Sequence, residues 1–175
     1  MAPIAFGRHF SLLALASVIL LALFQWQAQL VSEYPFALFG VFHALAVLGA
    51  LRAPRPLLES ALFVVAGGVL STGAMYFGIF AMGLTVPIAF TVASIFGAIT
   101  YGAVIRLLWL PHLPLRALAI TAGGCGIASL VALFLATNAE SRVQVWTLAW
   151  WWTFSGLLWS QIARPWRLTM RWSGP

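Results

Sequence analysis

The chain has 175 residues, of which 63% are hydrophobic and only 7% are charged, and its formal net charge is +6. A soluble globular domain carries roughly 45–50% apolar and about 25% charged residues, so this composition excludes a soluble domain and a disordered or collagen-like chain. The single cysteine excludes an intramolecular disulfide and a cysteine-based zinc site. The mean hydropathy of +1.01 therefore predicts one integral membrane domain over residues 1–175.

Six apolar segments each come close to the roughly 20 residues that a membrane-spanning helix needs. In chain order they are Phe10–Val31, Tyr34–Leu51, Leu57–Phe80, Val86–Leu110, Leu115–Thr137 and Gln144–Ala163. The loops between them are short, and prolines interrupt any helix at 52–56 and 111–114. We therefore expect an all-α fold, a transmembrane bundle of six spanning helices. The uncharged link at 81–86 fits either a loop or a re-entrant turn.

All nine basic residues are arginines, and their distribution indicates an orientation. If the N-terminus is cytoplasmic, eight of them fall on the cytoplasmic side and only Arg142 falls outside. Because basic residues concentrate in cytoplasmic loops, this split predicts that both termini are cytoplasmic. The expected location is the bacterial cytoplasmic (inner) membrane, with the lipid bilayer as partner. The arginines are scattered rather than clustered, which argues against nucleic acid as a partner.

Polar residues inside the first two apolar segments are candidates for a binding site. Gln25 lies near the outer end of the first segment, where either an aqueous vestibule or an interfacial helix end would explain it. His43 lies halfway along the second segment, and ionisable residues at that depth usually face the bundle interior. We expect its imidazole to contact a hydroxyl or backbone carbonyl of another helix. The alternatives are a role toward a solute or a proton, and a metal or haem site. The other histidines, His9 and His112, are expected near the cytoplasmic surface, out of reach of His43.

Small residues recur at helical spacing in the third and fifth segments. In lipid, such stripes allow two helix backbones to approach closely. The predicted packing residues are Gly67, Ser71, Ala74, Gly78, Ala122, Gly126 and Ser129. We expect each stripe to face a neighbouring helix.

A polar stripe follows the fourth segment and includes Thr91, Ser94 and Tyr101. Steps of three and four residues place these side chains on one helical face. The face fits either the wall of a polar cavity or a set of interhelical hydrogen bonds. With His43 and Gln25, these three residues are the candidate solute or polar-network positions.

The tryptophans are expected to form belts at the two membrane surfaces, because indole prefers the headgroup level. The outer cluster comprises Trp146, Trp150, Trp151 and Trp152, and Trp109 belongs to the inner belt. A cage that stacks on a ligand is the alternative for this cluster. Trp159 lies deeper in the sixth segment, where it needs close packing or a cavity.

These features predict a small multi-pass protein that binds or translocates a small neutral or apolar solute. The alternative is a non-catalytic accessory or assembly subunit of a larger membrane complex. Besides the bilayer, the partners to consider are a second copy of the chain, as a homo-oligomer, and another membrane subunit. A small membrane enzyme is a third reading, disfavoured because the sequence lacks paired intramembrane carboxylates, a nucleophile elbow and a phosphate loop. We assign no catalytic residue, no metal and no cofactor. A cavity joining His43 to the polar stripe would favour the solute, and small-residue stripes exposed to lipid would favour the accessory subunit.

Overall fold

A computed structural model describes residues 5–26, 35–51, 56–80, 86–136 and 139–163. Within these ranges the chain is all-helical, with six α-helices and no strand. The helices are α1 (Phe6–Trp26), α3 (Pro35–Ala50), α4 (Leu57–Phe80), α5 (Val86–Leu108), α6 (Leu115–Leu135) and α7 (Ala139–Ala163).

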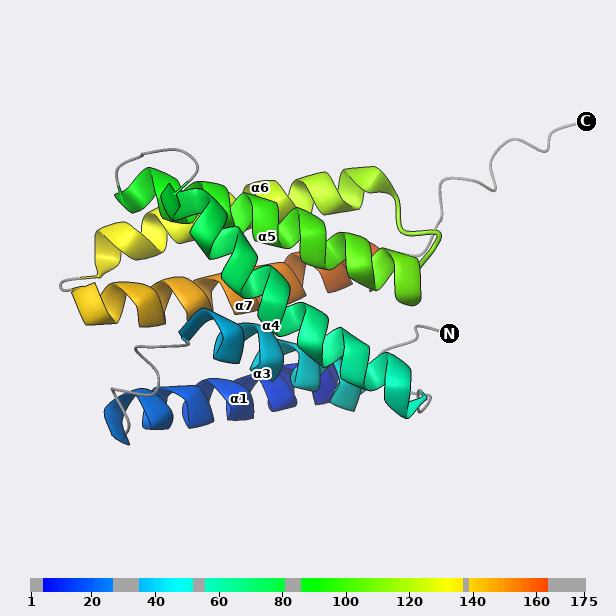
Figure 1. Ribbon diagram of the computed structural model, residues 1–175. Coiled ribbons are helices and arrows are strands. Elements are labelled where there is room, and N and C mark those ends of the chain that lie inside the picture. Colours follow the sequence, from blue (N-terminus) through cyan, green and yellow to red (C-terminus); the bar gives the residue numbers. More distant parts are fainter. Residues whose placement is uncertain (1–4, 27–34, 52–55, 81–85, 137–138, 164–175) are drawn as a thin grey trace, which may run out of the picture.

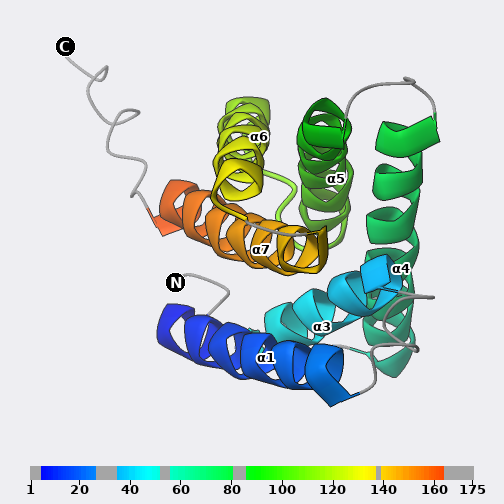
Figure 2. The same ribbon diagram turned by 90° about the vertical axis from the view of Figure 1, so that its left-hand side faces the viewer.

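The helices alternate in direction along the chain, so the start of α1 and the end of α7 lie at the same end of the bundle (Figure 1). Each helix packs against the next one in the chain, and α1 also contacts α7, so the first and last helices are neighbours (Figure 2). Helix α4 crosses its neighbours obliquely (Figure 1). The backbone N–H of Ala5 donates to the carbonyl oxygen of Ala50 at an N···O distance of 3.0 Å, which ties the start of α1 to the end of α3.

The helix boundaries agree best with the prediction where proline marks them. Helix α4 has the predicted bounds, and α3 begins at Pro35, whose missing N–H costs nothing in the first turn. Helix α1 begins at Phe6, four residues earlier than predicted, and α7 begins at Ala139, five residues earlier. Part of the loop expected between Thr137 and Gln144 is therefore helical, since alanine and glutamate favour a helix. The link at 81–85 lies outside the described residues.

Three helices are long and apolar enough to cross a membrane, judged by length and composition: Leu57–Phe77, Pro87–Leu108 and Leu115–Leu135. Two shorter apolar stretches occupy Gly7–Leu23 and Ala37–Ala50. Helix α7 is not among the three, because its described part carries five tryptophans and several hydroxyl and amide side chains between its aliphatic residues.

Large apolar side chains also cover the outer faces of the bundle. Val18, Leu62, Ile127 and Phe134 are each more than half exposed, on three different helices. A water-soluble protein rarely exposes so many large apolar side chains. The exterior and the three long apolar helices together support a transmembrane protein.

The small-residue stripe of α4 packs against α3, as the sequence predicts. A Cβ atom on Gly67 would lie 2.8 Å from the carbonyl oxygen of Gly40, and one on Gly40 would collide with the carbonyl of Gly67. Ser71 lies on the same face, because the Cβ position at Gly40 is also 2.8 Å from its Cβ atom. Ala74 is 4% exposed. The two backbones thus meet at Gly40 and Gly67, of which only Gly67 is predicted from the sequence. The surroundings of Gly78 lie outside the described positions.

The stripe of α6 also faces the bundle interior. Ala122, Gly126 and Ser129 are buried. A Cβ atom on Gly126 would lie 2.8 Å from Cγ1 of Ile95, on α5. At Gly126 the α6 stripe therefore lies against side chains of α5.

The glycine contact gives a stability prediction. We expect Gly40→Ala to lower the thermal unfolding temperature, because the new methyl group meets a backbone carbonyl that cannot rotate away. Overpacking of this kind costs about 1–3 kcal/mol. Gly73→Ala on α4 is the control, since nothing lies within 4 Å of that Cβ position. Thermal unfolding in detergent measures both variants, and equal unfolding temperatures would contradict the close α3–α4 contact.

Candidate functional site

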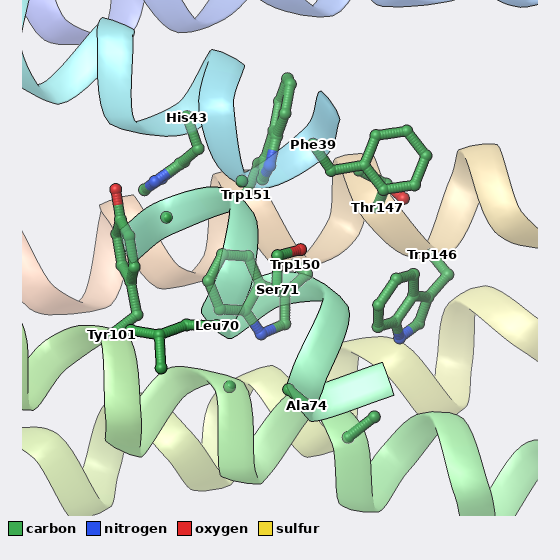
Figure 3. Close-up of a pocket in the computed structure, with 14 residues that line it drawn as sticks. Phe39, His43, Leu70, Ser71, Ala74, Tyr101, Trp146, Thr147, Trp150 and Trp151 are labelled. Atoms are coloured by element: carbon green, nitrogen blue, oxygen red, sulfur yellow. The ribbon is translucent and has the colours of Figure 1, made fainter. Parts of the chain in front are cut away.

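A cavity lies where α3, α4, α5 and α7 approach one another (Figure 3). It leaves about 40 Å³ for the centres of water-sized molecules. The lining residues of α3 and α4 are Phe39, Gly40, His43, Gly67, Leu70, Ser71 and Ala74. Those of α5 and α7 are Ala93, Gly97, Tyr101, Trp146, Thr147, Trp150 and Trp151. Small residues at the helix crossings leave the space, and five of the fourteen lining residues are phenylalanine, tyrosine or tryptophan.

Three tryptophans of α7 belong to this wall, so the predicted belt is wrong for them. Trp146 and Trp151 are only 7% and 1% exposed, and Trp150 is half-buried. The Nε1–H groups of Trp146 and Trp150 donate to the hydroxyl and the backbone carbonyl of Ser94, at 2.8 and 3.0 Å. Ser94, inside the bundle, therefore accepts the hydrogen bonds that lipid headgroups would accept in a belt. Trp152 is 41% exposed, which is compatible with a belt.

Trp109 and Trp159 are buried as well. Trp109 packs on Phe63 with ring centroids 4.3 Å apart, so the belt prediction is also wrong at this position. Trp159 is 2% exposed and meets the ring of His9 edge to face at 5.5 Å. Its predicted need for close packing is confirmed.

His43 faces the bundle interior and is 1% exposed, as predicted. Its Nε2 lies 3.1 Å from the hydroxyl oxygen of Ser155 on α7. Aromatic rings enclose the rest of the imidazole, with centroids of Tyr101, Phe154 and Trp150 at 5.2, 5.5 and 5.7 Å. The expected contact with a hydroxyl of another helix is therefore confirmed.

The prediction that His9 lies near the surface, out of reach of His43, is wrong. His9 is fully buried, and its Nε2 lies 3.0 Å from the same Ser155 hydroxyl. The two imidazole centroids are 6.2 Å apart. The error comes from the helix start: because α1 begins at Phe6, His9 lies inside the helix, beside His43 of α3.

The shared serine constrains the protons of both imidazoles. A hydroxyl has one proton and two lone pairs, so Ser155 can donate to one neutral imidazole while it accepts from the other. One ring then carries its proton on Nε2, and the other carries it on Nδ1. Through this bridge Ser155 joins α1, α3 and α7 at a single buried point.

The predicted polar stripe of α5 divides between two environments. The Ser94 hydroxyl hydrogen-bonds with that of Ser129 on α6 and accepts from Trp146, so it joins three helices. Thr91 donates to the carbonyl of Pro87 in its own helix at 2.8 Å. Of the stripe only Tyr101 lines the cavity, together with His43. The side chain of Gln25 lies outside the described positions.

Two polar atoms at this cavity have no hydrogen-bond partner among the described residues. They are the hydroxyl oxygen of Tyr101, whose side chain is 4% exposed, and Nδ1 of His43. Buried polar atoms of this kind are rare, because each lacks the bond that it would make with water.

The arrangement provides hydrogen-bonding groups and aromatic faces but no charge. None of the fourteen lining residues is an acid, a lysine or an arginine. Over the described part of the chain, no three histidine, cysteine, aspartate or glutamate side chains lie close enough together to hold a metal ion. The site can therefore bind a neutral molecule, whereas a charged one would lose its hydration with no opposite charge in return.

Comparison with known protein families, with curated proteins and with solved structures finds no match for this chain.

The shared serine gives a second stability prediction. We expect Ser155→Ala to destabilise the protein by about 1–3 kcal/mol, because it leaves Nε2 of two buried imidazoles without a partner. Ser160→Ala is the matched control on α7, since its half-buried hydroxyl only donates to the carbonyl of Leu157 in the same helix. Thermal unfolding in detergent compares the two. An equal effect of both substitutions would show that the imidazoles do not depend on Ser155.

Proposed function

We propose that this protein binds, and in its membrane translocates, a small neutral or apolar solute in the cavity between α3, α4, α5 and α7. The observation that carries the proposal is an aromatic-lined cavity with His43 and Tyr101 on its wall and no charged side chain. Ligand sites are typically apolar clefts between elements with a few polar groups that fix orientation. The cavity fits that description.

The size of the cavity supports a small solute. A water molecule needs roughly 10–15 Å³ of space for its centre, so 40 Å³ corresponds to roughly three waters. A molecule of about one six-membered ring is comparable in volume. A larger solute would require the helices around the cavity to separate.

The position of the packing stripes argues against the rival proposal, an accessory subunit that offers them to a partner. Gly67 and Gly126 each contact another helix of the same chain. Stripes that are already occupied inside the bundle leave no small-residue groove there for a second protein or a second copy.

We further propose six membrane spans with both termini cytoplasmic, in a bacterial inner membrane. The alternating helix directions support this arrangement (Figure 1). Arg8 begins α1, Arg106 ends α5 and Arg116 begins α6, so these three described arginines lie at the end of the bundle where the chain enters and leaves. A cytoplasmic position of that end follows the positive-inside rule.

The cavity is tested by filling it. A Cβ atom on Gly97 would lie 3.4 Å from that of Ala74 and 3.9 Å from Trp150, which is ordinary contact, so Gly97→Leu places its remaining atoms in the cavity. Gly123→Leu is the control, because nothing lies within 4 Å of its Cβ position. We expect benzene to change tryptophan fluorescence saturably in the wild type and in the control, but not in Gly97→Leu. The same unsaturable response in all three proteins would indicate partition into detergent and contradict the proposal.

The topology is tested by labelling single cysteines after replacement of Cys125. A membrane-impermeant maleimide applied to intact cells should label Asn138→Cys but not Ser173→Cys. Opening the cells should expose the second position. Labelling of both positions from the same side would remove the six-span arrangement.

A further inference from the structure

The two ends of the cavity differ in chemistry. Tyr101 and His43 lie at one end and Trp146 lies at the other (Figure 3). Five buried polar side-chain atoms lack a partner among the described residues, and the two that belong to residues of the cavity wall, Tyr101 Oη and His43 Nδ1, lie at this end. At the opposite end, the Nε1–H of Trp146 is already bonded to Ser94, so the indole offers the cavity its apolar surface.

We infer that the solute carries a hydroxyl group, which Tyr101 and His43 bind at one end of the cavity while its apolar body lies among Trp146, Trp150 and Leu70. This inference rests on the proposed function and names its substrate class, a neutral hydroxylated molecule of about one ring. The hydroxyl satisfies two buried atoms of the cavity wall that have no partner among the described residues.

A solute hydroxyl pairs with these two groups better than a solute oxygen that can only accept a hydrogen bond. The phenol group of Tyr101 can both donate and accept. Nδ1 of His43 accepts when Nε2 of the same ring donates to Ser155, and it donates when Nε2 accepts from Ser155. A solute hydroxyl has one proton and two lone pairs, so it pairs with both groups in either case. An ether or ketone cannot donate, so it fails whenever Nδ1 of His43 is the acceptor.

In the protein without solute, the hydroxyl of Tyr101, which has no partner among the described residues, lowers the stability of the fold. Leaving a buried donor or acceptor unpaired destabilises a fold, whereas removing such a group can be neutral or stabilising. Tyr101→Phe should therefore unfold at the same temperature as the wild type or at a higher one. If it unfolds at a lower temperature or fails to fold, the hydroxyl has a structural partner and the inference is wrong.

Binding is tested by fluorine NMR titration of the full chain in detergent with 4-fluorophenol and with fluorobenzene. The cavity-filled variant Gly97→Leu supplies the background from partition into micelles. We expect the wild type to bind fluorophenol roughly three- to tenfold more tightly than fluorobenzene, the effect of about one net hydrogen bond. Tyr101→Phe should weaken fluorophenol binding to the level of fluorobenzene and leave fluorobenzene unchanged. Tyr76→Phe, at a position that is 53% exposed, should leave both unchanged.

The outcomes separate the inference from the proposed function. If neither probe binds above the Gly97→Leu background, the proposed function fails and the inference fails with it. If both probes bind with equal affinity and Tyr101→Phe changes neither, the cavity binds solutes without reading a hydroxyl. The inference is then overturned while the proposed function stands.

Discussion

Every polar side chain inside an apolar helical bundle must find its hydrogen-bond partner within the protein, because hydrocarbon offers none. Several hydroxyls meet this constraint within their own helix: Ser17, Thr72 and Thr121 each donate to the carbonyl four residues earlier. Ser94 and Ser155 meet it between helices. Among the described residues, buried atoms of His9, Trp109 and Trp159 have no partner, and neither do Tyr101 Oη and His43 Nδ1. Of these, only Tyr101 and His43 line the cavity, and the inference of a hydroxyl-bearing solute follows from these two.

Close packing and open space have the same origin in this structure. The contact between Gly40 and Gly67 brings α3 and α4 together, and the large indoles of α7 fill the interior from the opposite side. Ala74 and Gly97, with side chains too short to reach across, leave the remaining space. The cavity therefore lies between the close α3–α4 contact and the indole rings of α7.

The sequence predicts the parts of this structure that depend on one helix at a time. Six helices, the buried faces of α4 and α6 and the inward position of His43 all follow from hydropathy and from helical spacing. The histidine pair was missed because it depends on two relations between helices, the start of α1 and the level of Ser155 on α7. A start at Phe6 instead of Phe10 is enough to move His9 from the expected surface into the bundle.

The tryptophans show the same limit. Indole suits a headgroup layer and a buried hydrogen bond equally well, so composition alone does not decide between them. Trp146 and Trp150 lie inside the bundle because Ser94 on a neighbouring helix accepts hydrogen bonds from both N–H groups. The spacing of α5 does predict that Ser94 and Tyr101 face inward, but it does not predict that only Tyr101 reaches the cavity.

The most direct test of a cavity that admits a small solute is anomalous diffraction from crystals held under xenon. Xenon is apolar and enters apolar cavities without needing a hydrogen bond. The account predicts a xenon peak enclosed by Ala93, Gly97 and Trp150. Xenon bound only on the outer faces of the helices, with no peak between α3, α4, α5 and α7, would contradict it.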